Sequence, residues 1–321
     1  MKAITQDRYG PPDVLELADV PMPELEDDRL LVRMRAAAVN PFDWHMMTGT
    51  PWLVRLQNGL RRPKARPGAD GAGIVEQVGS AVTAFTAGDE VWGSFRGSYA
   101  EYATTRERAI VPKPSSVSFE EAAAAPIAML TALQGLRDVG GLEEGDRVLV
   151  NGASGGVGTF AVQIAKAMGA HVTAVVSTRN VDMVRSLGAD EVIDYTTDDY
   201  TKGDARYDVI LDCVTTRGVI ANRRVMADDG VWVQAGMTKK GSVVMLLLRI
   251  LKLKLMNIWS SKKMRNFLSH SKKEDLEVMN EMLASGAVKP VIDRTFPLSA
   301  TADVLRHQGE GHARGKTVIT I

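Results

Sequence analysis

The sequence has little cysteine, no excess of either charge and no long apolar run. Cys213 is the single cysteine among 321 residues, which excludes an intrachain disulfide and a zinc site built from four cysteines. Basic and acidic residues number 39 each, so no chain-wide positive field is available to attract nucleic acid. No apolar run approaches the roughly 20 residues that span a bilayer, and no signal-peptide pattern follows Met1. We therefore expect a cytoplasmic protein that binds no nucleic acid.

The remaining composition, 45% hydrophobic and 24% charged, is that of a globular protein large enough for two domains. Residues 1–120 contain short β-like runs separated by glycine, proline and aspartate, which is typical of an antiparallel, barrel-like β domain. Beyond Phe119, predicted strands alternate with predicted helices, which indicates a parallel, doubly wound sheet. The strands expected there are 147–151, 171–177, 191–195, 207–214 and 231–236, and the helices are 120–136, 160–169, 181–188 and 218–226. The tail predicts helices at 274–286 and 301–308 and a strand at 316–321.

Three glycines, Gly152, Gly155 and Gly158, lie between a predicted strand and a predicted helix in VLVNGASGGVGTF (148–160). A tight turn and a close approach of the backbone to a diphosphate both need residues without a Cβ atom. The following helix would offer unpaired N–H groups and the positive end of its dipole. The context predicts a dinucleotide-binding loop; the structural alternative is a glycine turn that serves packing alone.

The residues after the second predicted strand bear on the choice of nucleotide. Sites that prefer NAD usually place an acidic residue here to bind the ribose 2′-hydroxyl, whereas this chain has Ser177, with Arg179 two residues later. A hydroxyl and a guanidinium would bind a 2′-phosphate that a carboxylate would repel. We therefore predict NADP(H); the alternative is that Arg179 is a solvated loop charge.

Several motifs in register resemble the medium-chain dehydrogenase/reductase superfamily along nearly the whole chain. They are AAAVNPFDW (36–44), RPGADGAGIVEQVG (66–79), FTAGDEVWG (85–93), GSYAEYA (97–103), TALQGL (131–136), the glycine loop, SLGADEVIDY (186–195), YDVILDCV (207–214) and GHARGKTVI (311–319). The resemblance implies a GroES-like β domain, completed by the C-terminal segment, around an inserted Rossmann domain. The expected bounds are 1–121 with 274–321 for the first domain and 122–273 for the second.

The zinc-dependent branch of that superfamily carries a cysteine ligand and a later Gly-His-Glu motif, and this chain departs from both. Pro41-Phe42-Asp43 and Pro67-Gly68-Ala69-Asp70 stand at those places, without thiolate or imidazole. His45 lies nearby, but a catalytic zinc site needs three protein ligands, so we expect a loop or core histidine and no metal. The chain therefore resembles the zinc-free quinone oxidoreductases and enone reductases.

The resemblance implies roles for individual residues. Asn40 is expected beside the nicotinamide and the substrate oxygen, as both a catalytic and a cofactor residue. The other expected cofactor-binding residues are Thr131, Gly152, Ser154, Gly155, Gly156, Val157, Gly158, Ser177, Arg179, Tyr195, Val214, Gly236 and Lys316. Simpler structural roles compete for four of them: a turn at Asn40, helix capping or packing at Thr131, a strand-end aromatic at Tyr195 and a surface charge at Lys316. The lysine that commonly binds the 2′-phosphate aligns with Asn180 rather than Arg179.

These features predict an NADPH-dependent oxidoreductase that transfers hydride, without metal, to a quinone or an α,β-unsaturated carbonyl. The alternatives are a zinc-free alcohol or aldehyde reductase and an NADPH-binding sensor or scaffold with little turnover, which the lack of an evident protein acid favours. An enoyl thioester reductase is disfavoured, because the stretch 45–53 lacks the tyrosine of that group. The expected substrate is a small hydrophobic carbonyl or quinone, and the resemblance implies a homodimer.

Residues 241–273 contain eight lysines and arginines and no acidic residue, among bulky aliphatic side chains. The favoured interpretation is an apolar lid or subunit contact with its basic residues facing water. The second interpretation is an amphipathic helix lying on an anionic membrane.

Overall fold

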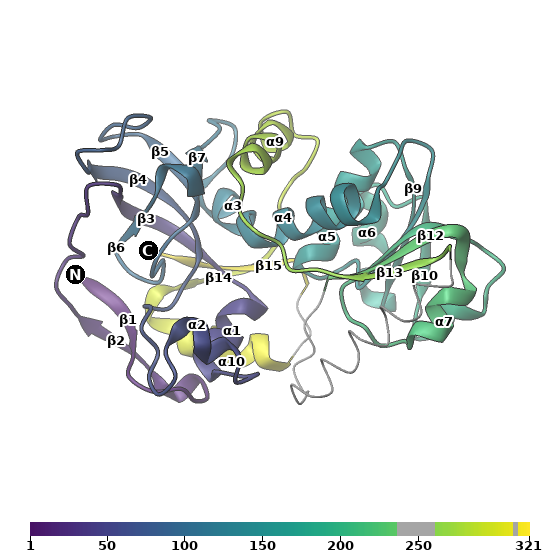
Figure 1. The fold of residues 1–321 in the computed structure, drawn as a ribbon, viewed down its shortest axis with the longest axis horizontal. Helices are drawn as coiled ribbons and strands as arrows, with labels where there is room; N and C mark the ends of the chain where they lie inside the picture. The colour runs from purple at the N-terminus through teal and green to yellow at the C-terminus, as the bar shows by residue number, and fades with distance from the viewer. Residues whose placement is uncertain (236–260, 311–313) are drawn as a thin grey trace. The chain divides into compact units, whose positions relative to one another are not determined.

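The computed structural model describes residues 1–235, 261–310 and 314–321 (Figure 1). The chain divides into two compact units. The first comprises Met1–Ala128, Ser271–Gly286 and Pro290–Ile321, and the second comprises Met129–His270 and Ala287–Lys289. The first unit is therefore assembled from both ends of the sequence, with the second inserted between them.

The first unit is built on a sheet that is antiparallel except at one edge. Among the described residues its strands follow the order β14-β15-β3-β4-β5-β7, with β6 also paired to β3. The bounds are β3 Leu30–Val39, β4 Asp70–Val78, β5 Glu90–Ser94, β6 Tyr102–Thr105, β7 Ile110–Pro112, β14 Ile292–Pro297 and β15 Lys316–Thr320. β15 pairs with β3 in antiparallel fashion, so the C-terminal strand completes the sheet of the N-terminal segment. This confirms the predicted GroES-like domain.

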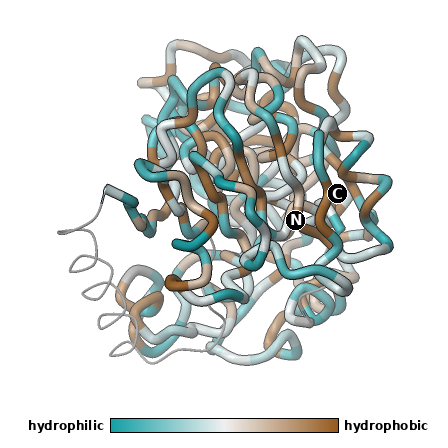
Figure 2. The backbone as a smooth tube through the Cα atoms, turned by 90° about the vertical axis from the view of Figure 1, so that its right-hand side faces the viewer, coloured by the Kyte–Doolittle hydropathy of each residue, from teal (hydrophilic) through white to brown (hydrophobic). Residues whose placement is uncertain are grey.

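The first half of β3 contributes to the core of this sheet. Leu30, Val32 and Met34 are at most 2% exposed and pack with Val91 and Phe95 from β5 and the residue after it. Within β3 only Arg33 and Arg35 are not buried, so the strand is covered on both faces over most of its length. Hydrophobic segments appear in brown in Figure 2.

A second core in this unit involves helices. The strands β1, Lys2–Gln6, and β2, Leu15–Asp19, form a separate antiparallel pair. Helices α1, Pro41–Thr48, and α10, Thr301–Glu310, contribute Met47 and Leu305 to the same buried cluster as Ile4 and Val39. Two more helices belong here, α2 (Val54–Asn58) and α9 (Lys273–Ala284). Trp92 anchors α9, because its Nε1 donates to Asn280 Oδ1 at 2.9 Å.

The single helix expected at 120–136 is two helices and a π-helical turn. They are α3 (Phe119–Ala124), α4 (Pro126–Gln134) and Gly135–Gly140. Proline lacks an N–H and its ring clashes with the preceding turn, so Pro126 ends one helix and begins the next. Ser118 caps α3: its Oγ accepts from the N–H of Glu121, whose carboxylate accepts from the N–H of Ser118.

The second unit contains a parallel sheet, which confirms the predicted Rossmann domain. Among the described residues its strand order is β10-β9-β8-β11-β12-β13, and every pair is parallel. The strands are β8 (Arg147–Asn151), β9 (His171–Val176), β10 (Glu191–Asp194), β11 (Tyr207–Asp212), β12 (Met226–Gln234) and β13 (Lys263–Asn266), and the helices are α5 (Gly156–Ala167), α6 (Val181–Ser186) and α7 (Val219–Arg224). The chain order reverses between β8 and β11. In such sheets ligands bind beyond the carboxyl ends of the strands at this reversal.

The basic segment 241–273 differs from its expected form where it is described. Lys263–Asn266 is neither lid nor amphipathic helix but the sixth strand, β13, paired in parallel with β12. Met264 is 2% exposed and belongs to the core of this unit. Residues 241–260 lie outside the described ranges. Within the described ranges no helix combines the length and apolarity needed to cross a bilayer.

Candidate functional site

The glycine loop follows β8, at the reversal point of the parallel sheet. Gly152 has a φ of +82°, a left-handed conformation that favours glycine. A Cβ at Gly158 would lie 2.2 Å from the carbonyl oxygen of Gly152 and 2.6 Å from the Cα of Ala153. Helix α5 therefore packs against the turn at a distance that only glycine permits.

The residues between these two glycines are accessible. Gly155 is the N-cap of α5, and the only atom near its hypothetical Cβ is the Gly152 carbonyl oxygen at 3.4 Å. Ser154, Gly156 and Val157 are partly exposed, whereas Gly158 is buried. The first N–H groups of a helix have no partner within the helix. The loop can thus present backbone donors to an anion, and it fits the diphosphate of a dinucleotide.

A second loop, after β11, borders the first. The nearest atom to a Cβ placed on Gly152 would be a Val214 methyl at 3.0 Å, and Val214 is about half exposed. This loop is held by Asp212, which is buried and accepts hydrogen bonds from Asn151 Nδ2 at 2.9 Å and Thr215 N at 2.7 Å. Burial raises the pKa of Asp212. Val214 therefore lies against the glycine loop, and its predicted role in cofactor binding stays a prediction.

The residues predicted to bind the adenosine end gather after β9 and β10. Arg179 and Tyr195 are exposed, and within the described chain Arg179 makes no hydrogen bond or ion pair. Ser177 Oγ accepts from Asn180 Nδ2 at 3.2 Å. The carboxylate of Asp194, at the end of β10, accepts from the hydroxyl of Thr178 next to Arg179, and this bond lowers the pKa of Asp194. The site thus contains both a free guanidinium and a carboxylate.

Thr131 and Gly236 are two further residues predicted to bind the cofactor. Thr131, on α4, is buried, and its Oγ1 is 2.9 Å from Ser269 Oγ. Gly236 lies outside the described residues. The cofactor role of both stays a prediction.

A cluster of buried polar residues lies in the first unit, where β3, β4 and β15 adjoin α1. Asn40 Nδ2 donates to Asp70 Oδ2 at 2.9 Å, and Lys316 Nζ donates to Asn40 Oδ1 at 2.5 Å. Asp70 Oδ2 also accepts from Ile127 N at 3.0 Å. The backbone N–H of Asn40 donates to Asp43 Oδ2 at 2.8 Å. Asn40 and Lys316 are thus side chains of the interior, 2% and 3% exposed.

Charge is costly in this cluster because water is excluded. Burial, reinforced by Asp70, raises the pKa of Asp43 to about 7. Burial likewise raises the pKa of Asp70 to about 6, although Lys316 opposes the shift. Burial lowers the pKa of Lys316, and the two carboxyl groups act in the opposite direction. The second carboxyl oxygen of Asp70, Oδ1, is buried without a hydrogen-bond partner, which favours its neutral form.

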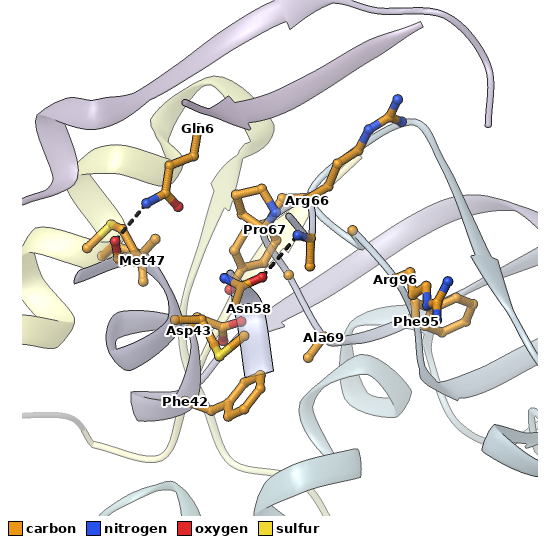
Figure 3. A pocket seen from close by; sticks show the side chains of 16 residues that line it. Gln6, Phe42, Asp43, Met47, Asn58, Arg66, Pro67, Ala69, Phe95 and Arg96 are labelled. Atoms are coloured by element: carbon orange, nitrogen blue, oxygen red, sulfur yellow. Dashed lines mark hydrogen bonds between the residues drawn. The ribbon is translucent and has the colours of Figure 1, made fainter. Parts of the chain in front are cut away.

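Asp43 also lines a pocket of about 220 Å³ that lies wholly in the first unit (Figure 3). Phe42, Met46, Met47 and Phe95 make much of its wall apolar. The hydroxyl-bearing Tyr99, which is fully buried and interacts with Asp43, lines it as well. Asp43 is the sole acidic residue among its lining residues, all of which are described.

Comparison with known proteins agrees with this geometry. Residues 26–115 match the family of alcohol dehydrogenase GroES-like domains, and residues 187–319 match a family described as zinc-binding dehydrogenase. The chain is 34% identical over 339 residues to the chloroplast envelope quinone oxidoreductase homolog of Arabidopsis thaliana, covering 99% of this chain and 98% of the relative. The chain belongs to the medium-chain dehydrogenase/reductase superfamily, in its quinone oxidoreductase-like branch.

Other members of this superfamily match this chain over almost the full length of the chain. A relative in Arabidopsis thaliana named NADPH-dependent alkenal/one oxidoreductase, chloroplastic, is 33% identical over 99% of this chain and 79% of its own. Among solved structures, the quinone oxidoreductase from Coxiella burnetii aligns with a TM-score of 0.87 at 30% identity, covering 100% of this chain and 99% of that chain.

The description of one matched family implies a bound zinc ion. The residues of this medium-chain dehydrogenase/reductase do not fit such an ion. Within the described residues no group of three histidine, cysteine, aspartate or glutamate side chains is arranged to hold a metal ion. The Lys316 ammonium binds the amide oxygen of Asn40, next to the motif in which a cysteine ligand was expected and is absent. A divalent cation there would meet a positive charge instead of a thiolate.

Sequence reasoning missed the acidic members of the buried cluster. Asp43 and Asp70 appeared only as letters of motifs in which expected zinc ligands were absent. The available signal was that both stand in otherwise apolar surroundings, AAAVNPFDW and GADGAGIV, where a carboxyl must be paired or neutral.

The contact of Gly158 with the turn predicts a specific loss of function. Gly158→Ala should weaken binding of a nicotinamide dinucleotide tenfold or more, about 1.4 kcal/mol, because α5 must move away from the loop. Fluorescence titration measures the affinity, and circular dichroism checks folding. Gly218→Ala is the matched control, since among the described residues no neighbouring atom lies within 4 Å of its Cβ position. Equal affinities in all three proteins would contradict this role of Gly158.

The raised pKa of Asp43 predicts how stability depends on pH. The folded state binds this proton more tightly than the unfolded state, whose carboxyl has a pKa near 3.8. The stabilisation is therefore complete below about pH 4 and is lost as the pH rises through about 7, by up to about 1.4 kcal/mol per pH unit. Asp43→Asn removes the ionising group, so its unfolding free energy relative to wild type should increase between pH 4 and pH 8.

Urea denaturation of both proteins at matched pH values measures this difference. Asp182→Asn serves as the control, because that side chain is fully exposed. If the difference in unfolding free energy between Asp43→Asn and wild type stays constant from pH 4 to pH 8, the raised pKa of Asp43 is refuted.

Proposed function

We propose that this protein is an NADPH-dependent reductase that transfers hydride to a quinone or an α,β-unsaturated carbonyl without a metal. The observation that carries the proposal is the glycine loop at the reversal point of the parallel sheet, with its α5 N-terminus open to an anion. The relatives support the same class, since their names specify quinone and alkenal/one oxidoreductases. A bound nicotinamide would supply the hydride, and the protein supplies binding, orientation and a proton.

The pocket in the first unit supports a small apolar acceptor. Its wall includes Phe42, Met47 and Phe95, which favour a quinone ring or an enone over a charged substrate. Reduction leaves negative charge on the substrate oxygen, which requires a proton. Asp43 lines this pocket, and because its pKa is about 7 a substantial fraction of the molecules carry the proton at neutral pH. We assign Asp43 as the proton donor.

Asn40 and Lys316 have a supporting role in this proposal. Both Asn40 amide atoms bind other members of the buried cluster, and Lys316 Nζ binds Val39 O at 3.1 Å as well as Asn40. These contacts suit positioning residues that hold α1, and with it Asp43, against the pocket. An acid at the pocket also supplies the proton whose evident lack kept the sensor without turnover open as an alternative.

The preference for NADPH is the finer part of the proposal. The exposed, unpaired guanidinium of Arg179 supports binding of a 2′-phosphate, and Ser177 offers a hydroxyl. Asp194 nearby acts against that preference, because its ionised carboxylate would repel the phosphate. We therefore propose that NADPH is preferred but NADH is also accepted. The cytoplasmic location and the homodimer stay predictions.

A substrate panel tests the reaction class. Purified protein should consume NADPH with quinones and enones, more slowly with aldehydes, and equally well in the presence of a chelator. Asp43→Asn should lower kcat by about 10²-fold or more while leaving NADPH affinity unchanged. Loss of activity on chelation with recovery on adding zinc would contradict the metal-free reaction. NADPH binding without consumption by any panel member would favour the sensor.

The nucleotide preference is tested at Arg179. Arg179→Ala should raise the Kd for NADPH by roughly tenfold to a hundredfold, the worth of one or two charge-assisted hydrogen bonds, and leave the Kd for NADH unchanged. Arg185→Ala is the control, since this arginine on α6 is also exposed. Equal affinities of the wild type for NADPH and NADH would overturn the preference.

A further inference from the structure

Residues 50–66, here named the basic-apolar loop, combine cations with exposed apolar side chains. No acidic residue occurs between Asp43 and Asp70 in the sequence. Within that interval Arg61, Arg62 and Lys64 are exposed, and in the described part of the chain none of the three forms an ion pair. This contrasts with the chain as a whole, whose charges balance.

The apolar side chains of this loop are unusually open to solvent. Trp52, Leu56 and Leu60 are 54%, 59% and 63% exposed. Burial of such side chains on folding is the rule, and an exposed apolar group rimmed by polar residues marks an interaction surface. Tryptophan, leucine and arginine together are the composition of segments that lie in the interface of a membrane.

The loop is held in place rather than loosely attached. Tyr9 OH donates to Gly59 O at 2.7 Å, and the Tyr9 ring lies 4.6 Å from the Arg55 guanidinium. The buried Asn58 closes the loop, because its Oδ1 accepts from Ala65 N at 3.0 Å. Arg55 is thus engaged with the protein, whereas the tip that includes Leu60 projects its cations outward.

The basic-apolar loop also borders the pocket of the first unit. Asn58, Ala65 and Arg66 line that pocket, and Figure 3 shows Asn58 and Arg66 among the side chains around it. A surface bound by the loop would therefore lie beside the pocket.

We propose that the basic-apolar loop docks on an anionic lipid surface. The negative potential of such a surface attracts each cation, and Trp52, Leu56 and Leu60 would enter the headgroup region. The charge of the loop selects an acidic surface, and its exposed apolar groups select a lipid over a free phosphate. Docking itself does not depend on the proposed function. If that function holds, the pocket would receive quinones that are dissolved in the membrane.

Vesicle sedimentation of the full-length protein tests the proposal. Wild type should pellet with vesicles of equal parts phosphatidylcholine and phosphatidylglycerol, and not with phosphatidylcholine alone. Arg61→Glu/Arg62→Glu should lower the partition coefficient tenfold or more, because two attractive charges become repulsive. Leu60→Ser should lower it by a smaller factor. Circular dichroism and NADPH affinity in solution should match wild type for every variant.

The control is Arg108→Glu/Lys202→Glu, which changes the net charge equally at two exposed residues elsewhere. It should pellet like wild type. Failure of wild type to pellet with the acidic vesicles, equal losses in test and control, or unchanged pelleting of Arg61→Glu/Arg62→Glu would each overturn the proposal. A wild-type dimer that becomes monomeric in Leu60→Ser would assign the surface to a second copy of the chain instead.

Discussion

The contact between the turn at Gly152 and the first turn of α5 is the constraint on which the proposed nucleotide site depends. With no Cβ at Gly158, the helix approaches the loop closely, and the first N–H groups of a helix have no partner within it. The parallel sheet supplies the frame, since β8 and β11 end side by side where the chain order reverses. Asp212 holds the Val214 loop against the same turn. The proposed anion site is therefore made of backbone groups that the sheet, the helix and both loops position.

In the first unit the main physical constraint is different: it is the free-energy cost of burying charged groups. Asp43, Asp70 and Lys316 lie together out of water, so their protonation states depend on one another. The zinc-dependent members place a metal centre at the corresponding motifs. Here Lys316 Nζ donates to the side chain of Asn40, and the backbone N–H of Asn40 donates to Asp43. These hydrogen bonds hold the start of α1. The same burial that makes the cluster costly raises the pKa of Asp43 to about 7, which is the property that the proposed proton donor needs.

Sequence reasoning predicted the features that depend on local pattern. The strand–glycine loop–helix order and the alternating strands and helices are encoded by neighbours in the sequence, and the structure contains them. The features it missed depend on distant residues. α1 is one, because its start is stabilised by Asp43 within a cluster that also needs Asp70 and Lys316. β13 is another, because its basic, short sequence becomes a strand only through pairing with β12. The pocket and its acid likewise depend on loops far apart in the chain.

A crystal structure of the protein with bound NADP⁺, grown in the presence of a chelator, tests the central claim most directly. The account predicts diphosphate oxygens at hydrogen-bonding distance, about 2.7–3.2 Å, from backbone nitrogens of residues 155–158, with no metal ion near Asn40. A diphosphate bound elsewhere, or a nucleotide that enters the crystals only when zinc is supplied, would contradict it.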